Sequence, residues 1–184
     1  MNRPSRTRRG LLAAAAAGAL ALSGCAGPAI SDFEGQRPAL DLREYFNGPL
    51  VAHGVFTDRS GKVVKRFRVD MVGTWNGDTG VLDVDFTYSD GTKERRVWTL
   101  KRSADGRRYT GTAGDVIGEA QGEVAGNALR WRYVLKVPVD GSPWTFDFDD
   151  WMYLMDSQVM LNRATMSKWG IKVGEVTLSF HKPR

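Results

Sequence analysis

Turn pairs that contain glycine recur along the chain from residue 60 to residue 141, and they constrain the fold more than any other feature. Asparagine or aspartate followed by glycine readily adopts the positive φ angles of tight β-hairpin turns. About 12 to 21 residues separate successive pairs, which leaves no room for the helices that connect parallel strands. The pairs are Ser60-Gly61, Asn76-Gly77, Asp90-Gly91, Asp105-Gly106, Gly126-Asn127 and Asp140-Gly141. This spacing predicts an antiparallel meander of about nine or ten strands.

Apolar and polar residues alternate between these turns, as they do in strands that have one face in a core. One apolar face comprises Leu82, Val84, Phe86 and Tyr88, and another comprises Leu129, Trp131, Tyr133, Leu135 and Val137. A long meander with one apolar face buries that face and removes its free edges when it closes on itself. The sequence therefore predicts an all-β, antiparallel up-and-down barrel of about 8–10 strands over residues 41–184. A sandwich of two sheets is the alternative.

The composition fits one folded domain. The chain has 184 residues, of which 42% are hydrophobic and 26% charged, so it lacks the low hydrophobicity of disordered proteins. A single cysteine excludes an internal disulfide and a cysteine-rich metal site. His53 and His181 have no partners at metal-ligand spacing, so we expect neither a metal nor a cofactor. The sequence carries no signal for an oligomeric state.

The N-terminal segment is typical of a cleaved export signal. Four arginines precede an apolar stretch from Leu11 to Leu22 that is too short for a good membrane span. The string Leu22-Ser23-Gly24-Cys25 follows, which is an aliphatic residue, two small residues and the only cysteine. It resembles the lipobox of bacterial lipoproteins. We expect residues 1–24 to be the signal peptide, Cys25 to carry diacylglycerol and residues 25–40 to form a lipidated tether. An ordinary secretory signal is the alternative.

Loss of the signal peptide changes the charge of the protein. It removes four arginines and no acidic residues, so the mature chain has 22 basic and 21 acidic residues. A dense basic face for nucleic acid is therefore not expected. The partner predicted instead is a membrane, through the lipid on Cys25. Ala26 stands where an aspartate usually retains such lipoproteins in the inner membrane. This favours the outer membrane, with the protein facing the periplasm.

Several longer strings resemble one known family. They are Asp115-Val116-Ile117-Gly118, Val137-Pro138-Val139-Asp140-Gly141, Phe148-Asp149-Asp150-Trp151-Met152-Tyr153, Asn162-Arg163-Ala164 and Gly174-Glu175-Val176-Thr177-Leu178. Together they resemble a family of bacterial lipoproteins described as domain of unknown function 3833, over about residues 30–182. The resemblance implies a lipocalin-like architecture, and it implies no particular activity.

Asp150 is the most unusual residue of the predicted interior. With a period of two, it shares a strand face with large apolar residues of the run from Trp144 to Asp156. A buried carboxylate needs a partner or a proton, and Arg96 and Arg163 are candidate partners. The functional interpretation is a polar group in a ligand cavity. The structural alternatives are an internal ion pair that fixes strand register, or a bulge that turns Asp150 outward.

These features favour a binding protein that holds a lipid or another apolar molecule in its barrel. A barrel of this size can enclose one small ligand. The residues expected to bind the ligand are Asp150, Arg96, Arg163, Phe67, Met71, Phe86, Trp131, Tyr133, Phe146 and Phe148. No catalytic residue is predicted, since no strong nucleophile accompanies the acidic run. One alternative is an enzyme or isomerase that acts on a lipid through Asp150 and an arginine. The other is a solid barrel with a structural or assembly role in the cell envelope.

Overall fold

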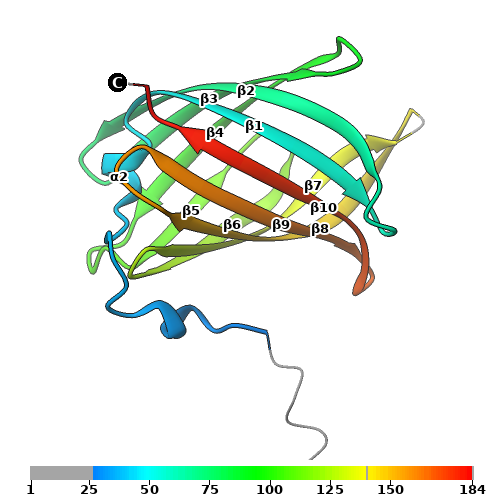
Figure 1. The fold of residues 1–184 in the computed structure, drawn as a ribbon. Helices are drawn as coiled ribbons and strands as arrows, with labels where there is room; N and C mark the ends of the chain where they lie inside the picture. Colours follow the sequence, from blue (N-terminus) through cyan, green and yellow to red (C-terminus); the bar gives the residue numbers. More distant parts are fainter. Residues whose placement is uncertain (1–26, 140, 184) are drawn as a thin grey trace, which may run out of the picture.

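The computed structural model describes residues 27–139 and 141–183, and it shows a closed antiparallel barrel (Figure 1). Each strand pairs with its neighbours in sequence, and β1 pairs with β10 to close the barrel. The strands are β1 (Gly48–Asp58), β2 (Val63–Asn76), β3 (Thr79–Tyr88), β4 (Lys93–Arg102), β5 (Arg108–Thr112), β6 (Val116–Ala125), β7 (Ala128–Val139), β8 (Ser142–Leu154), β9 (Val159–Lys168) and β10 (Ile171–His181). The predicted barrel is confirmed, and the two-sheet sandwich is excluded.

The turn pairs lie where the strands reverse. The glycines of all six predicted pairs fall between consecutive strands, and each has a positive φ. No turn pair was predicted for the reversal between β9 and β10. There Trp169 has a φ of 52° and Gly170 a φ of 76°, so a tryptophan takes the place that asparagine usually has in such turns.

The segment before the barrel packs against its outer surface. Residues Ile30–Phe33 form a short 3₁₀-helix, η1, and the Phe33 ring lies 5.7 Å from Trp151 and 5.4 Å from Tyr153. The Leu40 backbone N–H donates a hydrogen bond of 2.8 Å to the Gly126 carbonyl. The later half of the expected tether is therefore held by the aromatic side chains on the outer face of β8. The predicted signal peptide and Cys25 lie outside the described residues.

A single helical turn closes one end of the barrel. Helix α2 (Leu42–Tyr45) lies across this end in Figure 1, and Leu42, Tyr45 and the adjoining Phe46 are buried. The Tyr45 hydroxyl donates to the Gln158 carbonyl at 3.1 Å. The Trp75 indole N–H donates to the Phe46 carbonyl at 3.3 Å. These bonds join the α2 segment to β2 and to the β8–β9 connection, which are not neighbours in the barrel. We call this end of the barrel the closed end.

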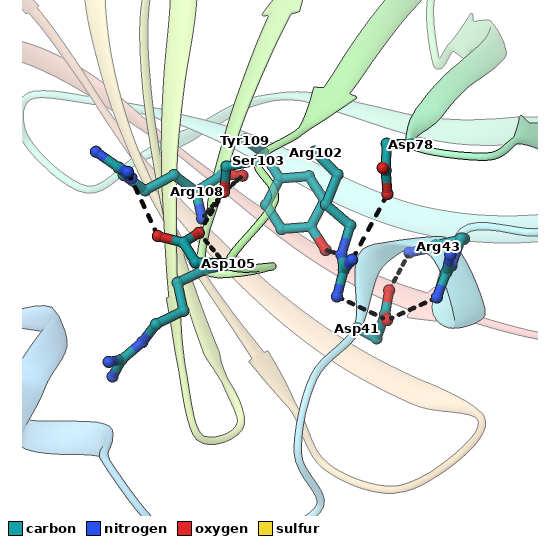
Figure 2. A network of polar contacts seen from close by, with 9 residues as sticks. Asp41, Arg43, Asp78, Arg102, Ser103, Asp105, Arg108 and Tyr109 are labelled. Carbon is teal, nitrogen blue, oxygen red and sulfur yellow. Dashed lines mark hydrogen bonds and ion pairs between the residues drawn. The ribbon is translucent and has the colours of Figure 1, made fainter.

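Arg102 contacts the residues at the start of α2, as Figure 2 shows. Asp41 caps the helix by accepting a hydrogen bond of 2.8 Å from the Arg43 backbone N–H. The Arg102 guanidinium lies 3.7 Å from the Asp41 carboxylate and 3.6 Å from Asp78, and it donates to the Tyr109 hydroxyl at 3.2 Å. One side chain of β4 therefore contacts the helix cap, the β2–β3 turn and β5.

The described helices are too short for membrane spans. Both η1 and α2 have four residues, and no helix in residues 27–139 or 141–183 combines the length and hydropathy needed to cross a membrane.

Candidate ligand-binding cavity

The barrel is hollow between α2 and the opposite end. Its cavity has a volume of about 1110 Å³, with Leu42 and Phe46 at the closed end. Apolar and aromatic side chains from eight of the strands form most of its wall. The hairpins β1–β2, β3–β4, β7–β8 and β9–β10 surround the other end, which we call the open end (Figure 1). A barrel filled by its own side chains would leave no such space, so the structure contradicts a solid interior.

Nine of the ten residues predicted for ligand binding line this cavity. They are Phe67, Met71, Phe86, Arg96, Trp131, Tyr133, Phe146, Phe148 and Asp150. The aromatic rings among them pack against one another. Tyr133 and Phe148 stack with centroids 5.1 Å apart, and Trp98 meets Tyr133 edge-on at 5.4 Å.

Arg163 was also expected in the cavity and does not line it. It lies on the outer face of β9, where its guanidinium pairs with Glu175 of β10 at 2.8 Å. Inward and outward side chains alternate along a strand, and the inward residues here are Asn162 and Ala164. The prediction that Arg163 is a partner for Asp150 is therefore wrong.

Asp150 projects into the cavity wall from β8, with 7% of its surface exposed. The Tyr133 hydroxyl donates a long hydrogen bond of 3.5 Å to its Oδ2. Burial raises the Asp150 pKa to about 8, and the charge of Asp149 adds to this rise. The Tyr133 hydrogen bond and the charge of Arg96 act in the opposite direction without offsetting it. The carboxyl group is therefore mainly protonated at neutral pH, which removes the need for a buried cation beside it.

Arg96 lies in the same cavity but has other partners. Its guanidinium is 2.8 Å from both the Glu94 and the Asp115 carboxylates, and it lies over the Phe86 ring at 5.2 Å. The expected direct pair with Asp150 is therefore absent among the described contacts, and Arg96 acts on Asp150 only through longer-range attraction. The strand β4 alternation predicted the inward position of Arg96. The β5–β6 connection, which holds Asp115, carried no comparable signal.

Asn162 is a buried polar residue of the cavity that the sequence analysis missed. It is 2% exposed and points inward from β9, between Met160 and Ala164 on the same face. Its amide nitrogen donates to the Trp151 carbonyl at 3.4 Å. The same period-two argument that placed Asp150 inward would have placed Asn162 there, since its face is otherwise apolar.

A patch of apolar and aromatic side chains lies at the open end. We define this rim patch by Val139, Trp144, Trp169 and Ile171, all of which are exposed, with Trp169 at 82% and Ile171 at 58%. Lys168 joins them, because its ammonium lies 4.4 Å from the Trp144 ring centroid and 4.9 Å from that of Trp169. These residues come from the β7–β8 and β9–β10 hairpins, beside the entrance to the cavity.

A family model described as "Protein of unknown function (DUF3833)" matches residues 19–182. The chain belongs to this family. The match confirms the resemblance found in the sequence and extends over the whole barrel of this DUF3833 member. A search of curated proteins returns no match.

A solved structure with a similar fold is the S-type phycobiliprotein lyase CPES from Guillardia theta. It superposes with a TM-score of 0.62, covering 85% of the DUF3833 chain and 99% of the lyase chain, at 6% sequence identity. At that identity the likeness concerns the fold alone, which is a lipocalin-like barrel.

The polar groups of the cavity do not resemble a metal site. Within residues 27–139 and 141–183, no group of three or more His, Cys, Asp or Glu side chains could hold a metal ion. Asp150 is the buried acidic residue of the wall, whereas the basic lining residues other than Arg96 are exposed and come from strand segments near the open end. They are Lys65, Lys93, Arg95 and Lys136. The cavity is thus suited to an apolar molecule with a small polar part.

Proposed function

We propose that this protein binds a lipid or similar apolar molecule inside its barrel. The observation that carries the proposal is the cavity of about 1110 Å³ with a predominantly aromatic and aliphatic wall. Binding sites for small molecules are typically cavities of about 300–1000 Å³ with apolar walls and few polar groups. Apolar space on this scale is costly to leave empty, and an apolar ligand removes that cost.

We further propose that diacylglycerol on Cys25 tethers the protein to the outer membrane, facing the periplasm. The support comes from the lipobox and from Ala26 in the sequence. The rim patch also supports a membrane as the source of the ligand. Tryptophan and lysine are favoured where lipid meets water, and Trp144, Lys168 and Trp169 lie together beside the cavity entrance. A lipid leaving the bilayer at this rim would enter the barrel directly.

The proposal is tested by filling the cavity at Ala164. This residue lies on the inward face of β9, directly opposite Asp150 on β8. In Ala164→Trp the indole would occupy the centre of the cavity. The control is Leu161→Trp, which adds a tryptophan to the exposed outer face of the same strand.

The readout is the fluorescence of phenylnaphthylamine, a neutral apolar dye that brightens when it leaves water. Wild type and Leu161→Trp are expected to bind it alike, and Ala164→Trp to weaken binding by at least about tenfold, a loss of ~1.4 kcal/mol. Circular dichroism checks that both variants keep the β fold. Equal dye binding by the folded Ala164→Trp variant would contradict binding in the cavity.

A second candidate function is chemistry on the bound molecule. It is favoured by one observation, the protonated carboxyl group of Asp150 inside the cavity. A carboxylic acid whose pKa is close to the working pH is suited to general acid catalysis. The similarly folded protein from Guillardia theta is a lyase by name, so this type of barrel is compatible with an enzyme. If the protein converts lipids from a membrane extract, Asp150→Asn should stop the conversion but leave dye binding intact.

A further inference from the structure

Two buried oxygen atoms in the cavity wall lack hydrogen-bond partners among the described residues. They are Asp150 Oδ1 and Asn162 Oδ1, and the two side chains are 7% and 2% exposed. Both residues line the cavity. A buried polar atom without a partner destabilises the folded protein, so native structures nearly always provide one. In a ligand cavity, the ligand can be that partner.

The two side chains are positioned to meet one ligand group. Asp150 is paired with Ala164 across β8 and β9, and Asn162 is two residues from Ala164 on the same inward face. They are therefore diagonal neighbours, which in antiparallel sheets lie about 7–8 Å apart. The residue between them on β9 is alanine, whose methyl group leaves space in front of the sheet.

The remaining contacts of these side chains define what each can still bind. The Asn162 amide nitrogen donates to the Trp151 carbonyl, so Asn162 Oδ1 is the atom left without a partner. Asp150 Oδ2 accepts from the Tyr133 hydroxyl, which leaves Oδ1 to carry the proton that burial retains at neutral pH. The pair thus offers an O–H donor from Asp150 and a carbonyl acceptor from Asn162, with no net charge.

The charge of Arg96 does not make the pair favour an anionic ligand group. Arg96 is held by Glu94 and Asp115, each at 2.8 Å, so its charge is already compensated. The other basic lining residues, among them Lys93 and Lys136, are exposed and lie near the open end. A fatty-acid carboxylate placed at the Asp150–Asn162 pair would therefore lose its hydration without gaining a free cation there, and it has no hydrogen to give Asn162. An ammonium group has hydrogens to give but cannot accept from Asp150. A hydroxyl group accepts one hydrogen bond and donates one, which matches the pair.

We propose that Asp150 and Asn162 select apolar ligands that carry a hydroxyl group, such as a long-chain alcohol or a hydroxylated lipid. The hydroxyl oxygen accepts from Asp150, and its hydrogen is donated to Asn162 Oδ1. The apolar chain extends along the aromatic wall of the cavity. This inference rests on the proposed function, since it concerns the same cavity, and it adds the chemical class of the ligand.

The test compares ligands that share one chain. Hexadecanol, its methyl ether, hexadecanoate and hexadecylamine each displace phenylnaphthylamine from the purified protein at neutral pH. The expected result is that hexadecanol binds about tenfold more tightly than the ether, the difference made by roughly one buried hydrogen bond. Hexadecanoate and hexadecylamine should also bind more weakly than hexadecanol.

Variants test whether the preference for the alcohol over the ether depends on the Asp150–Asn162 pair. Asn162→Leu nearly keeps the volume of the side chain and removes its acceptor. It should bring the alcohol and the ether to within about twofold of each other. Thr165→Val, a similar polar-to-apolar change on the outer face of β9, should preserve the full difference. A preference retained in folded Asn162→Leu would overturn the assignment.

The outcomes separate this inference from the proposed function. If no ligand displaces the dye and no dye binds, the proposed function itself fails. If alcohol and ether displace it equally well, the protein binds apolar molecules and only the hydroxyl selection is wrong. Tighter binding of the acid or the amine would likewise overturn it. The wild-type comparison decides the matter even if Asn162→Leu does not fold.

Discussion

Asp150 shows how a single buried acid makes the barrel sensitive to pH. An aspartate in an unfolded chain titrates near pH 3.9, roughly, whereas burial raises the Asp150 pKa to about 8 in the folded protein. The folded state therefore holds a proton that the unfolded state has lost between these two values. Stability must fall as the pH rises through this window, and it should be independent of this group above it.

The first prediction concerns this fall in stability with rising pH. The free energy of unfolding should decrease by up to about 1.4 kcal/mol per pH unit between about pH 4 and pH 8 through Asp150 alone. Asp150→Asn should lose this slope, because an amide does not titrate. Urea denaturation at a series of pH values measures it. Besides burial, the Asp150 pKa depends on Tyr133, Arg96 and Asp149.

Asp149→Asn is the matched control for this prediction. Asp149 is the adjacent residue but points outward, where both carboxylate oxygens accept from Arg130 at 2.8 and 2.7 Å. This variant should keep the downward slope, because burial is the larger cause of the raised Asp150 pKa, but the slope should end at a somewhat lower pH because the charge of Asp149 is gone. If Asp150→Asn and Asp149→Asn show the same pH dependence as wild type, the Asp150 pKa is not raised by burial.

At the residue scale, alternation along a strand reliably predicted which face a side chain lies on. It did not predict which residues of neighbouring strands lie in contact. The period of two placed Asp150 and the large aromatic residues correctly in the interior. It contains no information on which strand residues lie opposite each other, so Arg163 was chosen as a partner only because it is basic. Its position next to Asn162 in sequence puts it on the other face. Asp115 was missed as the partner of Arg96 because it lies in a connection, where alternation does not apply.

At the scale of the elements, turns determine where strands reverse, and close backbone contacts determine how α2 packs on the barrel. The turn pairs predicted where most hairpins reverse, but they did not predict the irregularity between Ile117 and Gln121 in the β6–β7 pairing, where Gly118 has a φ of 70°. The turn pairs carry no information on the role of α2 in closing the barrel. That role depends on a glycine in β2. A Cβ atom at Gly73 would overlap with the carbonyl oxygen of Phe46, which follows α2.

Gly73→Ala is therefore the second prediction. The added methyl group must push the α2 segment away from β2, which should lower the free energy of unfolding by about 1–3 kcal/mol. Gly114→Ala is the control, because a Cβ there meets nothing within 4 Å, and it should change stability by less than about 0.5 kcal/mol. Urea midpoints measure both. Equal stability of the two variants would show that α2 does not pack against Gly73.

At the scale of the whole molecule, the barrel combines a closed end, a hollow interior and an apolar rim. The sequence predicted a closed barrel because alternation and turns agree over ten strands. It left open whether the interior is solid or hollow, since that depends on how aromatic rings such as Trp131 and Phe148 tilt against their neighbours. Such packing is a property of all strands together. The rim patch was missed because its residues are distributed over two separate hairpins.

The third prediction concerns attachment to the membrane. Cys25→Ala should leave an unprocessed precursor that still carries residues 1–24, because the thiol that accepts diacylglycerol is gone. Immunoblotting of fractionated cells measures the size and the location of the protein. Ser23→Ala, which keeps a small residue in the lipobox, should be processed normally. Normal mature protein in Cys25→Ala cells would contradict lipidation at this position.

Native mass spectrometry of the barrel purified from its own cells tests the central claim most directly. The account predicts a bound molecule in a ratio of one to one, which organic extraction identifies as apolar. It also predicts that Ala164→Trp is recovered without it, whereas Leu161→Trp retains it. If the wild-type protein is recovered free of ligand, and remains free after incubation with membrane lipids and hexadecanol, the cavity does not serve to bind apolar molecules.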